Sequence, residues 1–206
     1  IDRPTMMSVL EDVFRTQLAK MYGTADNCDI IINIDKGDFE IWRNRTIVEN
    51  VEDPNTEVSL EEARQVDDSY EVGEDFTEEV KLSAFGRRGI LNIRQNLSGK
   101  IMEIEKTNLY KAYKERIGEI FVGEVYHAWK KEVLILDEDG NELVLPKSEQ
   151  IPSDFFRKGD SVKSVVANVE LRNNNPIITL SRTSPLFLER LFEQEVPEIF
   201  DGLITI

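Results

Sequence analysis

The chain has 206 residues, 40% of them hydrophobic, which is enough to bury the cores of two small domains or one large one. Its formal net charge of −15 argues against a protein that coats nucleic acid non-specifically, because phosphate binding needs a basic surface. The single cysteine, Cys28, the absence of an apolar run of about 18 residues and the absence of a signal-peptide pattern together predict a cytoplasmic protein without membrane contact.

The first predicted element is a helix over residues 8–22. Ser8 and Glu11 have the spacing of a capping box, in which the hydroxyl and the carboxylate each satisfy an amide at the helix end. Apolar side chains recur at helical spacing on one face, and Gly23 supplies the stop signal. That face comprises Leu10, Val13, Phe14, Leu18 and Met21.

A β-hairpin is predicted next. Residues 28–34 and 39–49 are rich in β-forming residues, and residues 35–38 have the composition of the turn between them. Successive side chains in a strand point to opposite faces, so alternate positions share one side of the sheet. On the first strand these positions are Ile30, Ile32 and Ile34.

Two helices complete this half of the chain. Ser59 and Glu62 form a second capping box that opens a short helix, and residues 72–75 are predicted to be a loop. A much longer helix then covers residues 85–116, in which Gly89 weakens the helix locally by about 1 kcal/mol against alanine. Its apolar residues, spaced three and four apart, predict a continuous seam that packs on the hairpin and the first helix. The seam comprises Ile90, Ile93, Leu97, Ile101 and Ile104.

A different pattern begins at Gly118. Short strand-like runs follow one another, and their number and length predict a five-stranded antiparallel barrel of the OB type. Asp139-Gly140 predicts a tight turn, Gly123 predicts the bulge that lets the first strand bend, and residues 155–160 predict the loop that re-enters the barrel. The predicted strands are residues 120–129, 132–136, 142–145, 161–171 and 177–180.

The predicted fold class is therefore α+β, in three parts. Residues 1–115 form an N-terminal α/β domain with a long connecting helix, and residues 116–184 form the five-stranded OB-type barrel. Residues 185–206 form a short C-terminal helical segment, with a helix over residues 186–192 that Pro197 brings to an end.

The sequence carries no catalytic or metal-binding motif. His127 is the only histidine and Cys28 the only cysteine, so there is no spaced cluster of metal ligands, and a nucleophile–base pair would have to use His127. The acidic run 137–142 fails as a calcium loop, since Glu142 stands where glycine is required and Ser148 where glutamate is. We predict no enzyme activity, no cofactor and no metal site.

A local basic face is expected only in the middle of the chain. Residues 1–115 carry 15 Lys+Arg against 24 Asp+Glu, residues 116–184 carry 9 against 11, and residues 185–206 carry 1 against 5. Single-stranded RNA is held by bases stacked on aromatic rings and by cations along the phosphates. The predicted RNA-binding cations are Lys130, Lys131, Lys147, Arg157, Lys158 and Arg182, with Tyr126, His127 and Trp129 as stacking groups. Composition alone equally allows these residues to be an ordinary solvated surface.

Several longer strings resemble the NusA family of bacterial transcription elongation factors. They are residues 56–64 and 85–87 in the first half, and residues 144–152 (VLPKSEQIP), 180–185 (LSRTSP) and 191–202 (LFEQEVPEIFDG) in the second. The resemblance covers nearly the whole chain in the same order. It implies a polymerase-docking domain in residues 1–115, an S1-type OB domain in residues 116–184, and the start of a truncated KH domain in residues 185–206.

The resemblance also implies a mode of action. Such a factor catalyses no reaction and modulates pausing, termination and antitermination by contacting core RNA polymerase and single-stranded nascent RNA. Other transcription or antitermination factors are candidate partners, and the protein is expected to be a monomer. Arg87, Arg88 and Arg94, at one end of the long helix, are the candidate residues for polymerase docking.

One departure from the resemblance reduces the predicted RNA surface. The wider S1-type family often has two aromatics around the second strand and a histidine in the third, where this chain has Trp129 or Lys130, Val133 and Pro146. RNA contact is therefore expected to be weaker and more electrostatic. Two alternatives stay open: a general RNA-binding protein attached to ribosomes without polymerase contact, and a ribonuclease with an OB tail, which would need a carboxylate or histidine cluster in its N-terminal domain.

Overall fold

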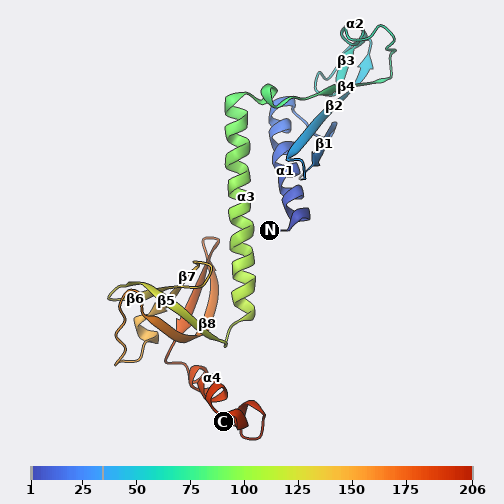
Figure 1. The fold of residues 1–206 in the computed structure, drawn as a ribbon. Helices are drawn as coiled ribbons and strands as arrows, with labels where there is room; N and C mark the ends of the chain where they lie inside the picture. Colours follow the sequence, from blue (N-terminus) through green and yellow to red (C-terminus); the bar gives the residue numbers. More distant parts are fainter. Residues whose placement is uncertain (1, 34, 206) are drawn as a thin grey trace. The chain divides into compact units, whose positions relative to one another are not determined.

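A computed structural model of the chain describes residues 2–33 and 35–205 (Figure 1). Its contacts divide into two compact units, residues 1–104 and 105–206. The α+β class and the predicted order of the elements are confirmed. In the described part of the chain, no helix combines the length and the apolar character that a membrane span requires.

The first helix, α1 (Arg3–Tyr22), begins five residues before its predicted start. Asp2 is the N-cap, since its carboxylate accepts a hydrogen bond from the backbone N–H of Thr5 at 3.1 Å, and Pro4 lies in the first turn. The prediction of a cap at Ser8 was therefore wrong, because these earlier signals are sufficient to start the helix. Gly23 ends it with a positive φ of 77°, as predicted.

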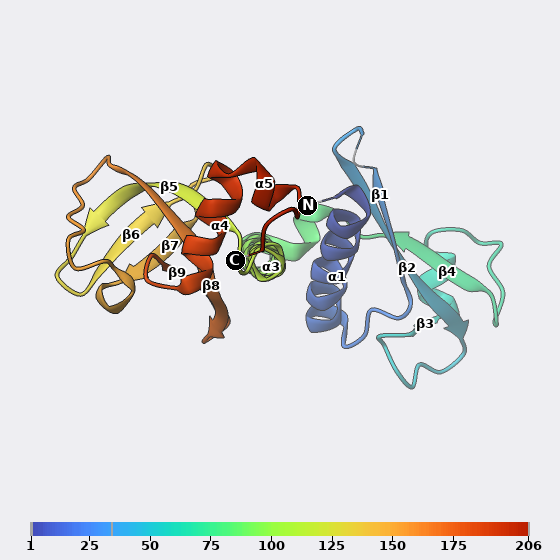
Figure 2. The same ribbon diagram turned by 90° about the horizontal axis from the view of Figure 1, so that it is seen from below.

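The hairpin of β1 (Cys28–Asn33) and β2 (Asp38–Val48) is confirmed. The helix α1 packs against the sheet to which this hairpin belongs (Figure 2). Ile30 and Ile32 are half-buried on one side and Ile31 is exposed on the other, while Ile34 lies outside the described residues. The core beneath the hairpin is formed by Phe14, Leu18, Ala25, Cys28, Ile41, Val80 and Phe85.

Two strands of this sheet were not predicted. β3 (Glu57–Ser59) pairs parallel to β2, and β4 (Asp75–Glu79) pairs antiparallel to it, so the loop predicted at 72–75 ends where β4 begins. The helix α2 (Leu60–Arg64) follows β3 and has its predicted cap, because the Ser59 hydroxyl accepts a hydrogen bond from the backbone of Glu62. A second small core of Ile47, Val58, Ala63 and Phe76 lies beneath these elements.

The long helix α3 (Gly86–Glu115) is confirmed, after a short 3-10 turn, η1 (Leu82–Phe85). Its predicted seam is not continuously buried, because Ile90 is 42% exposed whereas Ile93 packs on the first core. Gly89 is buried instead, and a Cβ at this position would lie 3.1 Å from the Cβ of Phe85 and 3.2 Å from Nε2 of Gln17. The glycine therefore permits a close approach in addition to weakening the helix.

The second unit is built on a closed barrel in the order β5-β6-β7-β9-β8, which confirms the predicted five strands (Figures 1 and 2). Four of its pairings are antiparallel, and β7 pairs parallel to β9 to close it. The strands are β5 (Ile120–Ala128), β6 (Glu132–Leu136), β7 (Glu142–Pro146), β8 (Ser161–Arg172) and β9 (Asn175–Ser181).

The bulge in β5 is not at Gly123. The register shift lies between Val125 and His127, so Tyr126 is the extra residue, and Gly123 pairs regularly with Val162. A Cβ at Gly123 would lie 2.6 Å from the carbonyl oxygen of Leu136. This glycine is required because neighbouring strands approach each other closely, which is a different reason from the predicted one.

Helices cover parts of the barrel unit. Leu109, Tyr110 and Tyr113 from the last turns of α3 pack on the barrel core. A single 3-10 turn, η2 (Lys147–Glu149), follows β7. The C-terminal helix α4 (Pro185–Glu195) is longer than predicted, and Pro197 both follows it and opens a last short helix, α5 (Pro197–Phe200).

Candidate nucleic-acid interface

The bulge in β5 exposes consecutive side chains at the end of this strand. Neighbouring residues of a regular strand face opposite sides, but the extra residue lets Tyr126, His127 and Ala128 all be exposed. Trp129 follows and is 50% exposed, and its backbone N–H donates to the carbonyl of Glu132 at 2.9 Å. One strand end thus presents three aromatic rings to solvent.

These rings contact one another. The ring centroids of Tyr126 and His127 are 6.3 Å apart, and those of His127 and Trp129 are 4.8 Å apart with an interplanar angle of 75°. Such packing limits the rotamers of exposed side chains. The rings therefore form one exposed aromatic cluster, and exposed rings are the groups on which unstacked bases stack.

The loop before β8 lies beside this strand end. Val125 and the loop exchange two backbone hydrogen bonds, in which the Val125 N–H donates to Asp160 and the Val125 carbonyl accepts from Gly159, at 2.9 and 2.8 Å. The Nζ atom of Lys158 lies 5.4 Å from the ring centroid of Tyr126. This contact joins the predicted cations of the loop to the predicted rings of the strand.

The same loop carries an aromatic residue that the sequence reasoning missed. Phe155 is 77% exposed, and the guanidinium carbon of Arg157 lies 5.4 Å from its ring centroid. Its neighbour Phe156 packs on the barrel core instead. The doublet Phe155-Phe156 in a loop was the only signal in the sequence, and it does not show which of the two rings is exposed.

Three lysines adjoin the rings through the chain or through a backbone hydrogen bond. Lys130 and Lys131 lie in the turn after Trp129, and the backbone N–H of Lys147 donates to the carbonyl of Lys131 at 2.8 Å. All three side chains are exposed. Within residues 2–33 and 35–205, none of these lysines, and neither Arg157 nor Lys158, takes part in an ion pair.

We call this region the aromatic–basic surface. It consists of Tyr126, His127, Trp129, Lys130, Lys131, Lys147, Phe155, Arg157 and Lys158. It combines the two groups that single-stranded nucleic acid requires, which are ring faces for the bases and unpaired cations for the phosphates.

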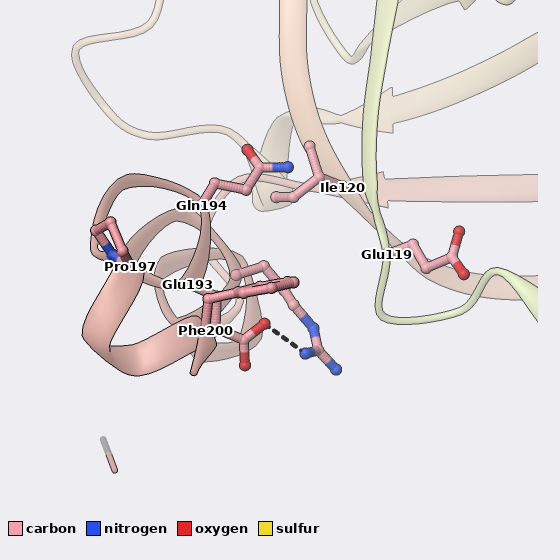
Figure 3. A pocket seen from close by; sticks show the side chains of 7 residues that line it. Glu119, Ile120, Glu193, Gln194, Pro197 and Phe200 are labelled. Carbon is pink, nitrogen blue, oxygen red and sulfur yellow. Dashed lines mark hydrogen bonds and ion pairs between the residues drawn. The ribbon is translucent and has the colours of Figure 1, made fainter. Parts of the chain in front are cut away.

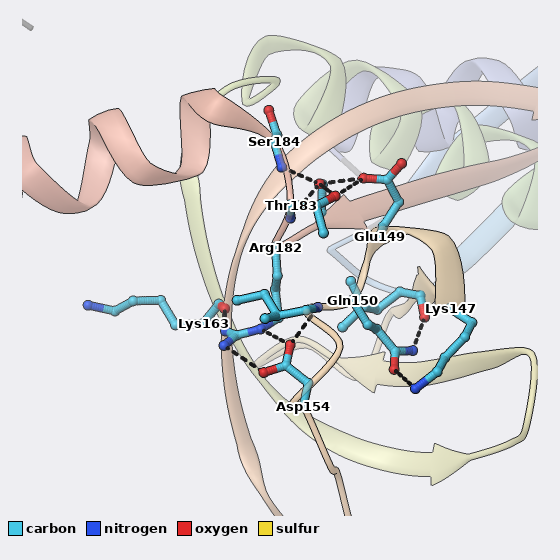
Figure 4. Close-up of polar contacts among 11 residues, drawn as sticks. Lys147, Glu149, Gln150, Asp154, Lys163, Arg182, Thr183 and Ser184 are labelled. Atoms are coloured by element: carbon cyan, nitrogen blue, oxygen red, sulfur yellow. Dashed lines mark hydrogen bonds and ion pairs between the residues drawn. The ribbon is translucent and has the colours of Figure 1, made fainter.

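Arg182, the remaining predicted RNA-binding residue, lies elsewhere. Its side chain is only 19% exposed, and Nε donates to the carboxylate of Asp154 at 2.7 Å (Figure 4). A further hydrogen bond runs from its guanidinium to the backbone carbonyl of Lys163. The structure therefore places Arg182 in contacts inside the barrel unit and not on the aromatic–basic surface.

The predicted polymerase-docking residues are on the first turns of α3. Arg87, Arg88 and Arg94 are all exposed. Arg87 and Arg94 are seven positions apart and so share one helix face, and Leu91, which is 51% exposed, lies between them. This face offers two cations and an apolar side chain.

A different corner of the barrel also holds aromatic and charged groups, but they are paired. The Tyr113 hydroxyl donates to Oδ2 of Asp137 at 2.5 Å, and Asp137 also accepts hydrogen bonds from Asp139 and Asn141. Partial burial would raise the pKa of Asp137, but these hydrogen bonds outweigh it and lower the pKa. Burial, and then the hydrogen bond to Asp137 and its charge, raise the pKa of Tyr113.

This Tyr113–Asp137 corner contains the acidic run that resembled a calcium loop. Its first carboxylate, that of Asp137, accepts hydrogen bonds from the backbone amides of Asp139 and Asn141 in the same loop. No group of three or more potential metal ligands occurs among the residues that the structure describes.

An open pocket lies between the two C-terminal helices and the start of β5 (Figure 3). Its charged groups are largely satisfied, since Arg190 pairs with Glu193 at 2.6 Å and donates to the carbonyl of Gly118. The lining residues include no histidine, cysteine or serine, and so no nucleophile–base pair. They are Glu119, Ile120, Arg190, Glu193, Gln194, Pro197 and Phe200.

The closed five-stranded barrel defines a protein of the OB-like fold class, whose members often bind nucleic acids. The NusA N-terminal domain family matches residues 1–107, more than half of the chain, and the chain belongs to the NusA family. The resemblance stated from the sequence is therefore confirmed, and the family is one of transcription factors and not of enzymes.

Three relatives illustrate the match. Each is a transcription termination/antitermination protein NusA, and each is similar over all of this chain. Those of Thermus thermophilus, Halalkalibacterium halodurans and Bacillus subtilis are 29%, 30% and 29% identical, and the aligned region covers 57%, 54% and 55% of their lengths. The chain thus spans about half the length of these relatives.

Proposed function

We propose that the chain is the part of a transcription factor that contacts RNA polymerase through residues 1–115 and nascent single-stranded RNA through residues 116–184. By these contacts it modulates elongation, pausing, termination and antitermination. Residues 185–206 lead into a KH domain in this proposal. The names of the relatives, which refer to termination and antitermination, support it.

The aromatic–basic surface is the observation that carries the RNA-binding part. The chain as a whole is strongly acidic, so RNA is repelled from most of it and can be held only where cations are free of acidic partners. The aromatic–basic surface has five cations that meet this condition, together with four aromatic rings. Because the rings are few, we expect modest affinity with a large electrostatic share.

A salt titration tests this part. The complete 206-residue chain would be titrated into a fluorescent, unstructured RNA of about 12 nucleotides at several salt concentrations, with binding followed by anisotropy. Each phosphate that the protein neutralises adds roughly −0.7 to the slope of log K against log salt, so we expect a slope of about −2 to −4. No binding at the lowest salt, or a slope near zero, would contradict the proposal.

Polymerase docking requires its own test. The face of α3 that carries Arg87, Leu91 and Arg94 supports docking on an acidic surface with an apolar centre. The complete chain should retain core polymerase in a pull-down at low salt, and the Arg87→Glu, Arg94→Glu variant should retain much less. Equal retention by both would remove these residues from the interface.

The same pull-down distinguishes this proposal from the second candidate function, that of a ribosome-associated RNA-binding protein without polymerase contact. That alternative predicts RNA binding with no retention of polymerase at all. It draws its support from the barrel alone, which occurs in many RNA-binding proteins.

A further inference from the structure

Arg182 connects three segments of the barrel unit through one side chain. Its guanidinium donates from Nε to Asp154 at 2.7 Å and to the backbone carbonyl of Lys163 in β8. It also lies over two rings, with its carbon 5.7 Å from the centroid of Phe156 and 5.4 Å from that of Phe187 in α4. A charge held by this many partners has no free direction in which to meet a phosphate.

The segment that Arg182 holds leads directly into the aromatic–basic surface. The backbone N–H of Arg182 donates to the carbonyl of Glu149 at 2.9 Å, and its side chain binds Asp154 (Figure 4). Asp154 also closes the intervening turn on itself, because its carboxylate accepts from the N–H of Ile151 at 3.1 Å and its own N–H donates to the Ile151 carbonyl at 2.8 Å. The next residue in the chain is Phe155.

The pair is well placed to act as a fixed anchor. The side chains of Arg182 and Asp154 are only 19% and 12% exposed, so solvent screens their attraction less than it screens a surface pair. The loop beyond them, by contrast, is exposed at Phe155, Arg157 and Lys158.

The far end of this loop is fixed by its backbone hydrogen bonds to Val125. Its near end is fixed by Asp154 and by the Phe156 ring, over which the Arg182 guanidinium lies. The order of the near end therefore depends on contacts that Arg182 makes.

We propose that Arg182, through Asp154, is a positioning residue that holds the loop of residues 151–158 in place before RNA arrives. This inference rests on the proposed RNA-binding function. Ordering a flexible loop on binding costs conformational entropy, and a loop that is already ordered avoids this cost. Arg182 then increases RNA affinity without contacting RNA.

The proposal predicts a result for Asp154→Asn that is opposite to the one expected from charge alone. Removing the negative charge of Asp154 should favour an anionic ligand if charge alone mattered. If Asp154 is half of the anchor, Asp154→Asn should instead weaken RNA binding, as Arg182→Met does. The two substitutions change the net charge in opposite directions, so a shared effect cannot come from the charge itself.

The test compares RNA affinity across salt for the complete chain carrying Arg182→Met, Asp154→Asn, or both. We expect each single variant to bind roughly five to thirty times more weakly, with the salt slope unchanged, because no phosphate contact is lost. The double variant should be no weaker than the weaker-binding single variant. Arg182→Lys, which keeps the charge pair, should restore part of the affinity.

Tyr113→Phe is the matched control, because it shows whether a general loss of stability in the barrel unit is enough to weaken RNA binding. It removes a partly buried hydrogen bond at a different corner of the same unit, so it should lower the melting temperature and leave RNA affinity unchanged. A second measurement needs no RNA: trypsin should cleave after Arg157 and Lys158 faster in Arg182→Met and Asp154→Asn than in Tyr113→Phe, with all three folded. If Arg182→Met fails to fold, Asp154→Asn and Arg182→Lys still give both readouts.

Two results would overturn the proposal. If Arg182→Met reduces the slope by roughly 0.7 while Asp154→Asn binds as well as or better than the unmodified chain, Arg182 contacts a phosphate directly. If the unmodified chain binds RNA and both variants bind it as tightly as the unmodified chain does, the anchor has no role in binding. Failure of the unmodified chain to bind RNA at any salt would instead overturn the proposed function, and this inference with it.

Discussion

Two corners of the barrel unit hold aromatic and charged side chains next to each other, and only one of them leaves these groups available. At the Tyr113–Asp137 corner the hydroxyl, the carboxylate and the loop amides satisfy one another. On the aromatic–basic surface the rings are exposed, and among the described residues the cations take part in no ion pair. The comparison teaches that the same types of residue can either satisfy one another or be left available, and only available groups can receive a ligand.

Reversing two charges on the aromatic–basic surface should have the largest effect on RNA binding. Lys130→Glu, Lys131→Glu removes two cations that face no acid, and at about 0.1 M salt each lost phosphate contact weakens binding roughly fivefold, so we expect a loss of about 25-fold or more. Anisotropy with the RNA described above measures it.

The matched control is Lys111→Glu, Lys114→Glu. Both of these lysines are exposed on the last turns of α3, next to Tyr113, and the net charge changes by the same amount. Equal losses in the two double variants would mean that overall charge, and not a particular surface, governs binding.

Removing one ring should have a smaller effect of a different kind. Base–aromatic stacking contributes about 1–3 kcal/mol per base, so Trp129→Ala should weaken binding about tenfold and leave the salt slope unchanged. The chain contains one other tryptophan, Trp42 in β2, which provides the control. A loss of affinity in Trp42→Ala as great as that in Trp129→Ala would place the RNA outside the barrel.

The smallest effect on RNA binding is expected at the Tyr113–Asp137 corner. Tyr113→Phe removes the donor to a partly buried carboxylate and should lower the free energy of unfolding by about 1 kcal/mol, while RNA affinity stays within error. Urea denaturation and anisotropy on the same samples measure both. A clear loss of RNA affinity would show that both corners contribute to binding.

The same variant should show a distinctive dependence on pH. The lowered pKa of Asp137 contributes stability that is present above its unfolded value near 4 and is lost as pH falls through the folded value. The raised pKa of Tyr113 contributes stability that is present below about 10 and is lost as pH rises toward the folded value. The stability difference between the unmodified chain and Tyr113→Phe should therefore be greatest between these limits and narrow above pH ~10. A difference that stays constant across pH 7 to ~11 would contradict this explanation of the corner.

Elements with a strong hydrophobic period could be predicted from the sequence. The hairpin, the long helix and the five barrel strands were found within a few residues of their predicted limits. β4 was missed because its sequence, DFTEE, holds three acids in five residues and is a strand only through its pairing with β2. The position of the bulge was wrong because it depends on the register between β5 and β6, which a single strand does not reveal.

The candidate surface was predictable to a similar extent. Residues that follow one another in the chain, from Tyr126 to Lys131, could be grouped by proximity alone. Phe155 was missed because its exposure depends on Phe156 taking the place at the core. The ion pair of Arg182 could not be predicted, because a sequence shows a charge but not its partner, here Asp154.

The most direct test of which corner meets RNA is an NMR titration of the ¹⁵N-labelled 206-residue chain with unstructured RNA. We expect the largest amide shift changes at residues 126–131 and 155–158 and at Lys147, with little change at residues 137–141. Shift changes that concentrate at residues 137–141, or within residues 1–104, while the aromatic–basic surface stays unperturbed, would contradict the assignment.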